Sequence, residues 1–161
     1  MKKISFIAVL LLAVASLASC RSNKPVAPTI NEGVCAVPCF QYGSNVTAQE
    51  AKEITDAFRV NFHPSKYKMM ELDRVDKAFE SRGYPRKKMT KQQMCEVGRA
   101  LGVKLMVVGT INKLMDEYSV DVQVVNVLKE TTVAFEGSAF QKTDASKEMQ
   151  AIAQKLASKV E

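Results

Sequence analysis

Side chains for nucleophilic or metal chemistry are scarce in this chain of 161 residues. Histidine occurs once, at His63 beside Pro64, and cysteine occurs four times. A catalytic thiol needs a base beside it, and a zinc site needs ligands at spacings such as Cys-x-x-Cys, which the sequence does not contain. We therefore predict no metal, no cofactor and no catalytic residue, and we assign His63 to a surface or capping role at a helix end.

Three cysteines lie in the body of the chain, at Cys35, Cys39 and Cys95. If residues 34–40 form a strand, Cys35 and Cys39 are roughly 13 Å apart, too far to bridge each other, whereas either could reach Cys95 in the fold. The odd number leaves at least one thiol unpaired. We favour three small buried residues, and the alternative is a reactive thiol with a depressed pKa.

The fourth cysteine, Cys20, ends an N-terminal targeting pattern. Two lysines precede an apolar run over 4–17, and the run closes on Leu17-Ala18-Ser19-Cys20. A run this short is typical of a secretory signal and not of a permanent transmembrane helix. The closing residues resemble the lipobox of bacterial lipoproteins, which implies cleavage before Cys20 and lipidation of that residue. An ordinary cleavage site with an incidental thiol is the alternative.

We expect three parts along the chain: a signal peptide over 1–19, lipidated Cys20 with a flexible tether over 20–33, and one domain over 34–161. Prolines and the absence of apolar periodicity indicate an extended tether. Its thirteen residues after Cys20 reach about 43 Å at roughly 3.3 Å each. The domain is therefore expected close to the membrane that holds the lipid.

Arg21 follows Cys20, where inner-membrane retention in enterobacteria prefers aspartate, so we expect the periplasmic face of the outer membrane. Removal of the signal leaves 21 basic and 17 acidic residues, a net charge of +4. Export and this mild charge argue against a nucleic-acid partner. The one enriched basic segment is interpreted as a partner-binding surface or as a solvated loop, and it comprises Arg82, Tyr84, Arg86, Lys87, Lys88 and Lys91.

Hydrophobic patterning in the first half predicts a strand, a helix, a strand and two helices. The apolar run over 34–40 is the first strand, with Pro38 near its end or at an edge. Thr47 and Glu50 form a capping box for a helix that ends near Pro64. Residues 66–72 fit a second strand, which is followed by a short helix capped by Asp73 and a longer helix from Thr90 to Gly102.

The second half predicts three strands and a helix. Residues 104–111 are apolar on both faces, which favours a central strand covered by helices on both sides. Strands over 118–124 and 133–140 should complete an antiparallel meander, before a helix over 144–160. The predicted order is β-α-β-α-α-β-β-β-α with a mixed sheet. Methionines are expected mainly to fill gaps in the core: Met69, Met70, Met89, Met94, Met106 and Met115.

Residues 96–103, Glu-Val-Gly-Arg-Ala-Leu-Gly-Val, followed by 105–111, Leu-Met-Val-Val-Gly-Thr-Ile, resemble the helix-to-strand signature of CsgG/LpoB-type bacterial lipoproteins. The resemblance extends over 51–62, 67–75 and 121–132. It implies a two-layer or three-layer α/β domain similar to an anticodon-binding domain. The family includes a curli secretion lipoprotein and penicillin-binding-protein activators.

The resulting expectation is an outer-membrane lipoprotein that acts as a non-catalytic protein-binding or assembly module. Its partners would be the membrane through Cys20 and either another envelope protein or further copies of itself, with no small-molecule substrate. The alternative is an activator of a penicillin-binding protein, although the short tether favours a partner near its own membrane. The segment over 103–140 is too short for the membrane-inserting hairpins of a curli-type pore.

Overall fold

The computed structural model describes residues 28–84 and 87–161. The predicted signal peptide and Cys20 fall in residues 1–27, and Arg86 falls in 85–86, so these predictions lie outside the described residues. Among the described residues, no helix has the length and apolarity needed to cross a membrane. The elements are β1 (Asn31–Ala36), β2 (Gln41–Tyr42), α1 (Ala48–Asn61), β3 (Lys68–Met69), α2 (Leu72–Glu80), α3 (Lys91–Leu101), β4 (Val103–Leu114), β5 (Glu117–Asn126), β6 (Thr131–Gln141), the 3-10 helix η1 (Lys142–Asp144) and α4 (Ala145–Lys159).

The predicted order of elements is confirmed, with the short strand β2 and the short 3-10 helix η1 as additions. β1 begins at Asn31, earlier than the expected domain boundary, because the Asn31 amide donates to the carbonyl of Gly102 and adds a rung beside β4. The strand predicted over 66–72 contracts to β3, since the chain turns into α2 at Leu72. The cap predicted at Asp73 is wrong, because the helix already begins at Leu72 and Glu71 occupies the cap position.

The strands form one mixed sheet in the order β3-β1-β4-β5-β6, with β2 pairing along the distal part of β4. β1 runs parallel to both β3 and β4, whereas β4, β5 and β6 form the predicted antiparallel meander. β4 is therefore the central strand that joins the parallel and antiparallel halves.

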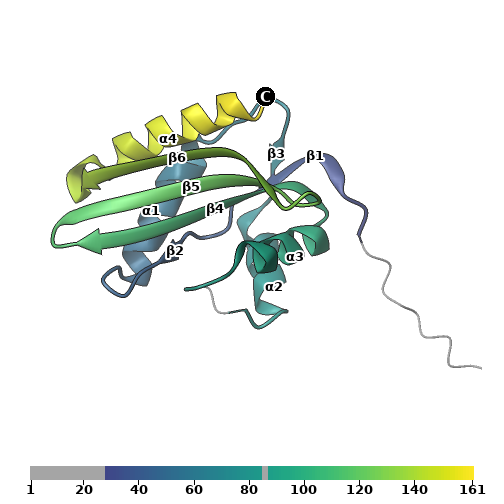
Figure 1. Cartoon of the computed structure of the whole chain (residues 1–161), viewed down its shortest axis with the longest axis horizontal. Coiled ribbons are helices and arrows are strands. Elements are labelled where there is room, and N and C mark those ends of the chain that lie inside the picture. Colours follow the sequence, from purple (N-terminus) through teal and green to yellow (C-terminus); the bar gives the residue numbers. More distant parts are fainter. Residues whose placement is uncertain (1–27, 85–86) are drawn as a thin grey trace, which may run out of the picture.

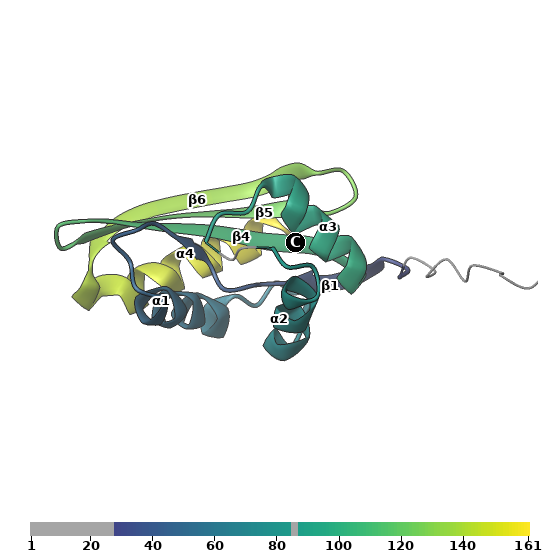
Figure 2. The ribbon, with the colours of Figure 1, turned by 90° about the horizontal axis from the view of Figure 1, so that it is seen from below.

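The helices cover the sheet unequally. Figure 2 shows α1 and α4 together beneath the long strands, whereas α2 and α3 gather at the end where β1 enters (Figure 1). Side chains alternate accordingly along β4, because Leu105 and Val107 belong to the core with α1 and α4 and Met106 belongs to the core with α2 and α3. The domain thus has three layers at one end and two at the other, and β4 is covered on both faces only near its start.

Local signals explain why the helices begin and end where they do. Thr47 and Glu50 form the predicted capping box of α1, and Thr90 forms another with Gln93 at the start of α3. Gly102 ends α3 with a φ of +69°, which glycine adopts without steric cost. The apolar faces predicted for α1 and α4 are buried, and their members are Ala51, Ile54, Phe58, Phe62, Met149, Ile152 and Leu156.

Candidate protein-binding surfaces

The basic segment of residues 82–91 connects α2 to α3. Arg82, Lys87, Lys88 and Lys91 are exposed to solvent. The fold therefore presents the described cations of this segment on one connection at the surface, as the sequence predicts.

The segment is attached to the core through Met89, whose side chain is buried with those of α2 and α3. The buried Gln41 side chain accepts from the Met89 amide at 2.7 Å and donates to the Met89 carbonyl at 3.2 Å. These two hydrogen bonds reproduce a backbone pairing with a side-chain amide. The C-terminal part of the basic segment is therefore held in place.

Tyr84 has a different environment from the lysines. Its hydroxyl donates a hydrogen bond to the Glu96 carboxylate on α3, and this bond raises the pKa of Tyr84. Lys87 lies over the ring of Tyr42, 5.3 Å from its centroid, as a cation–π contact. Tyr84 and Lys87 thus brace the segment against α3 and β2, which leaves Arg82, Lys88 and Lys91 as its described exposed cations without such a contact.

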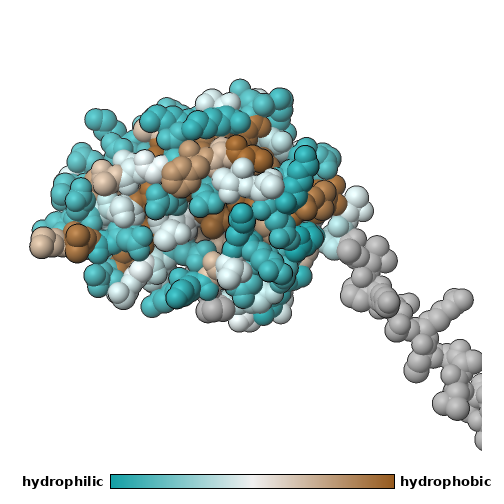
Figure 3. Space-filling view, in the orientation of Figure 1, coloured by the Kyte–Doolittle hydropathy of each residue, from teal (hydrophilic) through white to brown (hydrophobic). Residues whose placement is uncertain are grey.

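A second exposed surface, the β4–β5 hairpin tip of Leu114 and Met115, was not predicted. Leu114 is 75 % exposed and Met115 is 89 % exposed, so Met115 does not fill a core gap as expected. Met115 has a φ of +54°, a left-handed conformation that ordinarily favours glycine. Figure 3 shows hydrophobic atoms protruding at the left end of the molecule, where Figure 1 draws the turn between β4 and β5. The alternation of apolar and polar residues in the two flanking strands predicts a turn here. The neighbouring residues, however, do not indicate that the apolar side chains of the turn are exposed to solvent.

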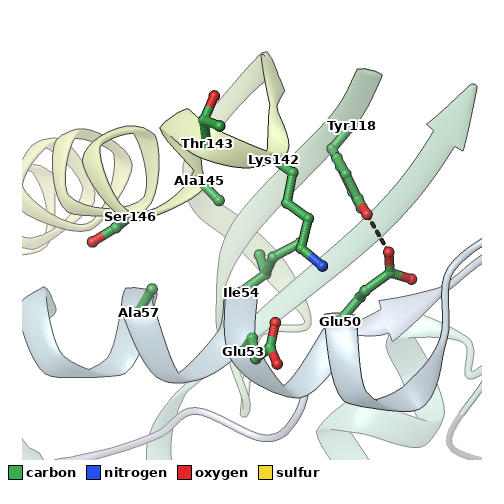
Figure 4. A pocket seen from close by; sticks show the side chains of 9 residues that line it. All are labelled: Glu50, Glu53, Ile54, Ala57, Tyr118, Lys142, Thr143, Ala145 and Ser146. Carbon is green, nitrogen blue, oxygen red and sulfur yellow. Dashed lines mark hydrogen bonds between the residues drawn. The ribbon is translucent and has the colours of Figure 1, made fainter. Parts of the chain in front are cut away.

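The cavity between α1 and the start of α4 has a volume of about 220 Å³. Figure 4 shows Ile54, Ala57 and Ala145 along it, with the Lys142 side chain descending toward Glu50 and Tyr118. The cavity therefore combines an apolar wall with a charged end.

The Glu50 carboxylate is fully engaged at that charged end. It accepts from the Tyr118 hydroxyl, from Lys113 Nζ at 3.0 Å and from the Thr47 amide at 2.8 Å. The Tyr118 hydrogen bond, followed by those from Thr47 and Lys113, holds the pKa of Glu50 far below its usual range. A carboxylate that stays ionised and saturated cannot serve as a general acid or base near neutral pH. Glu50 instead ties the start of α1 to the β4–β5 hairpin.

A second cavity of about 240 Å³ lies between β2, α1 and α2, beside Cys39 and Phe40. The Cys39 thiol is 3.8 Å from the Thr55 hydroxyl. That buried hydroxyl donates to the Ala51 carbonyl at 2.7 Å and accepts from the Phe40 amide at 3.0 Å. The Thr55 hydroxyl is therefore committed to hydrogen bonds within the protein.

Cys35 and Cys95 lack the environment of a nucleophilic thiol. Both residues are buried and free. Cys95 therefore does not form the disulfide with Cys35 or Cys39 that the sequence left open. Burial raises the pKa of Cys35 to about 11 and also raises that of Cys95. A reactive thiol requires the opposite shift, so the raised pKa values argue against thiol catalysis at these two positions.

In the segments that the structure describes, no three His, Cys, Asp or Glu side chains gather closely enough to hold a metal ion. His63 is exposed at the end of α1, and its Nε2 lies 2.7 Å from the Val60 carbonyl. This contact confirms the capping role predicted for His63.

No protein-family model matches the chain, and no curated protein matches its sequence. Solved structures do share its fold. The LpoB C-terminal domain from Salmonella enterica is 13 % identical, with a TM-score of 0.52, over 71 % of this chain and 87 % of that domain. LpoB from E. coli is 17 % identical, with a TM-score of 0.53, over 70 % of this chain and 59 % of that one.

Lipoprotein GNA1162 from Neisseria meningitidis is 9 % identical, with a TM-score of 0.55, over 68 % of this chain and 80 % of that one. At these identities the likeness shows the fold alone. It supports the LpoB part of the predicted resemblance, whereas the relation to the curli secretion lipoprotein stays a prediction. The chain therefore has the fold of an LpoB-type C-terminal domain.

Proposed function

We propose that this chain is a lipid-anchored envelope protein that acts by binding another protein. The observation that supports this most directly is the fold shared with the LpoB C-terminal domain, 87 % of which is covered. The engaged Glu50 carboxylate and the raised pKa values of Cys35 and Cys95 also favour a binding role over catalysis.

The more specific proposal for the partner is a penicillin-binding protein, whose peptidoglycan synthesis this chain would activate. The family that the sequence resembles includes such activators, and LpoB domains are among the structural neighbours of this chain. The contact surface that we assign to this partner is the basic segment, since its cations are exposed and Met89 fixes its position. An acidic surface on the partner would complement it.

The anchor that we propose remains the lipid on Cys20, at the periplasmic face of the outer membrane. Because β1 begins at Asn31, the tether between Cys20 and the sheet has about ten residues and reaches about 33 Å. A penicillin-binding protein embedded in the inner membrane must therefore extend toward the outer membrane to meet this domain.

The test compares glycan polymerisation by a purified synthase with and without the full-length chain in detergent. We expect stimulation by the wild-type protein, and a loss of at least about tenfold in affinity for the variant Lys88→Glu/Lys91→Glu. The matched control, Lys147→Glu/Lys155→Glu, makes the same charge change at exposed positions on α4 and should stimulate normally.

Two results would contradict these proposals in different ways. Unchanged polymerisation with wild-type protein would remove the synthase as partner. Equal loss of stimulation in both double variants would remove the basic segment as the contact surface, since it would indicate a response to net charge alone.

A further inference from the structure

Strand β6 forms one edge of the sheet and, among the described strands, pairs only with β5. It has 11 residues, whereas β3 at the opposite edge has two. Figure 1 shows β6 as the outermost of the three long strands. A long edge of this kind offers a row of backbone N–H and C=O groups to another strand.

The backbone groups that face the free edge can be assigned. Lys159 Nζ donates to the Phe135 carbonyl at 3.4 Å, which indicates that this carbonyl points away from β5. The N–H and C=O of one residue point to the same side of an antiparallel strand, and the side alternates along the chain. Gly137, Ala139 and Gln141 therefore also face the free edge, since the register shift in this pairing lies upstream.

This stretch lacks the usual protection of an edge strand. Natural edges carry prolines, charges or bulges, or are covered by another element. The only charge over 135–141 is Glu136, and its carboxylate is bridged by Lys159 from α4. Gly137 and Ala139 are small and exposed. Lys159 thus covers the Phe135 carbonyl and pairs with Glu136, and residues 137–141 beyond it carry no charge.

An apolar patch adjoins the open edge. Val133 and Phe135 are 47 % and 50 % exposed. Phe135 lies on the sheet face opposite to α1 and α4, and its Cζ would be 3.7 Å from a Cβ added to Gly137. Figure 3 shows hydrophobic atoms on this face over β6. A strand added at the edge would shield this patch from water.

We propose that β6 pairs antiparallel with β6 of a second copy of this chain, about a twofold axis at Gly137. In this register Phe135 lies opposite Ala139 of the second copy, so that each large ring meets a small residue, twice by symmetry. Because residues 137–141 carry no charge, the edges of two chains do not repel each other electrostatically. The two-residue β3 is too short to pair along β6 head to tail, so the assembly closes as a dimer and not as a filament.

The first test removes one outward-facing donor without disturbing the sheet. Ala139→Pro deletes an N–H that points to the free edge, a position where an edge strand tolerates proline. Ala139→Ser keeps that N–H and a small side chain opposite Phe135, and it is the matched control. Native mass spectrometry and sedimentation of the full chain in detergent should show a wild-type dimer, a retained dimer for Ala139→Ser, and a dimer dissociation constant at least about tenfold higher for Ala139→Pro.

Thermal unfolding keeps this test interpretable, because Ala139→Pro should unfold cooperatively near the wild-type temperature. A monomeric wild-type protein would overturn the proposal. An unaltered dimer in a folded Ala139→Pro variant would also overturn it, since the interface would then lie elsewhere.

The second test locates the axis directly. A cysteine at Gly137 would lie opposite its own copy, and its Cβ displaces only the Asp121 carboxylate, which is flexible. Oxidation or a short bismaleimide should crosslink Gly137→Cys into a dimer in intact membranes. Ser119→Cys lies on the same sheet face but on β5 and should remain monomeric. Equal crosslinking of both variants, or of neither, would contradict the proposed register.

Discussion

The ring of Phe40 lies directly against Gly109 on the central strand. A Cβ at position 109 would come within 2.3 Å of the ring, so no other amino acid fits without displacing it. Phe40 packs in turn on Phe58 of α1, with ring centroids 5.2 Å apart. This contact seats the segment between β1 and β2 on β4 and places Gln41 where it can bind Met89.

Gly109→Ala should therefore destabilise the protein by about 1–3 kcal/mol through overpacking. Gly33→Ala is a suitable control, because its Cβ would meet nothing closer than 3.7 Å, and it should change stability by less than about 0.5 kcal/mol. Urea unfolding followed by circular dichroism measures both. If the Phe40 ring is the obstacle, Gly109→Ala should cost less free energy of unfolding in a Phe40→Leu background than in the wild type. Additive free-energy changes in the double variant would refute this explanation.

The cluster around Glu50 should make stability depend on pH. Its folded pKa is depressed by the Tyr118, Thr47 and Lys113 hydrogen bonds, and an unfolded glutamate titrates near about 4.3. The unfolded state thus binds the proton first, so this contribution is complete above about pH 5 and falls as the pH drops below it. Glu50→Gln should lose about 2 kcal/mol at pH 7 and show a shallower decline in acid.

The control for this prediction is Glu53→Gln, which removes a carboxylate from the same helix but outside the cluster. Its stability should follow the wild-type curve from pH 7 to pH 3. Parallel acid declines for Glu50→Gln and the wild type would show that Glu50 does not carry the dependence.

The hydrogen bonds from Gln41 should hold the basic segment in a fixed conformation at Met89. Gln41→Met keeps the side-chain volume but leaves the buried Met89 N–H and C=O without their partner, at a cost of about 2 kcal/mol. Hydrogen exchange of the Met89 amide should accelerate, whereas Gln92→Met on the exposed face of α3 should leave it unchanged. An unaltered Met89 amide in Gln41→Met would show that the segment is held by side-chain packing alone.

The buried thiols should be unreactive in the folded protein. Cys35, with its pKa raised to about 11 by burial, and Cys95, with a raised pKa, should resist iodoacetamide at pH 8 and react fully in urea. Peptide mass spectrometry after timed labelling measures this. Rapid alkylation of either residue in the folded protein at neutral pH would restore the hypothesis of a functional thiol.

Features encoded by neighbouring residues were predictable from the sequence. The capping boxes at Thr47 and Thr90, the αL turn at Gly102 and the alternation that buries one face of β5 all follow from interactions within a few positions. The same holds for the exposure of the basic segment, because a run of lysines and arginines between two amphipathic helices has no apolar face to bury.

Contacts between distant segments were decided only in three dimensions. β2 exists because the Phe40–Gly109 contact lays residues 41–42 beside β4, and β3 is short because α2 begins at Leu72. Met115 is exposed because the hairpin of β4 and β5 extends beyond every helix. Edge position is also a property of the whole sheet, since a strand's own residues specify its alternation but not whether a neighbour lies beside it. The sequence by itself therefore determined the elements and their buried faces, whereas tertiary packing decided which backbone and side-chain groups, along β6 and at the hairpin tip, remain available to a partner.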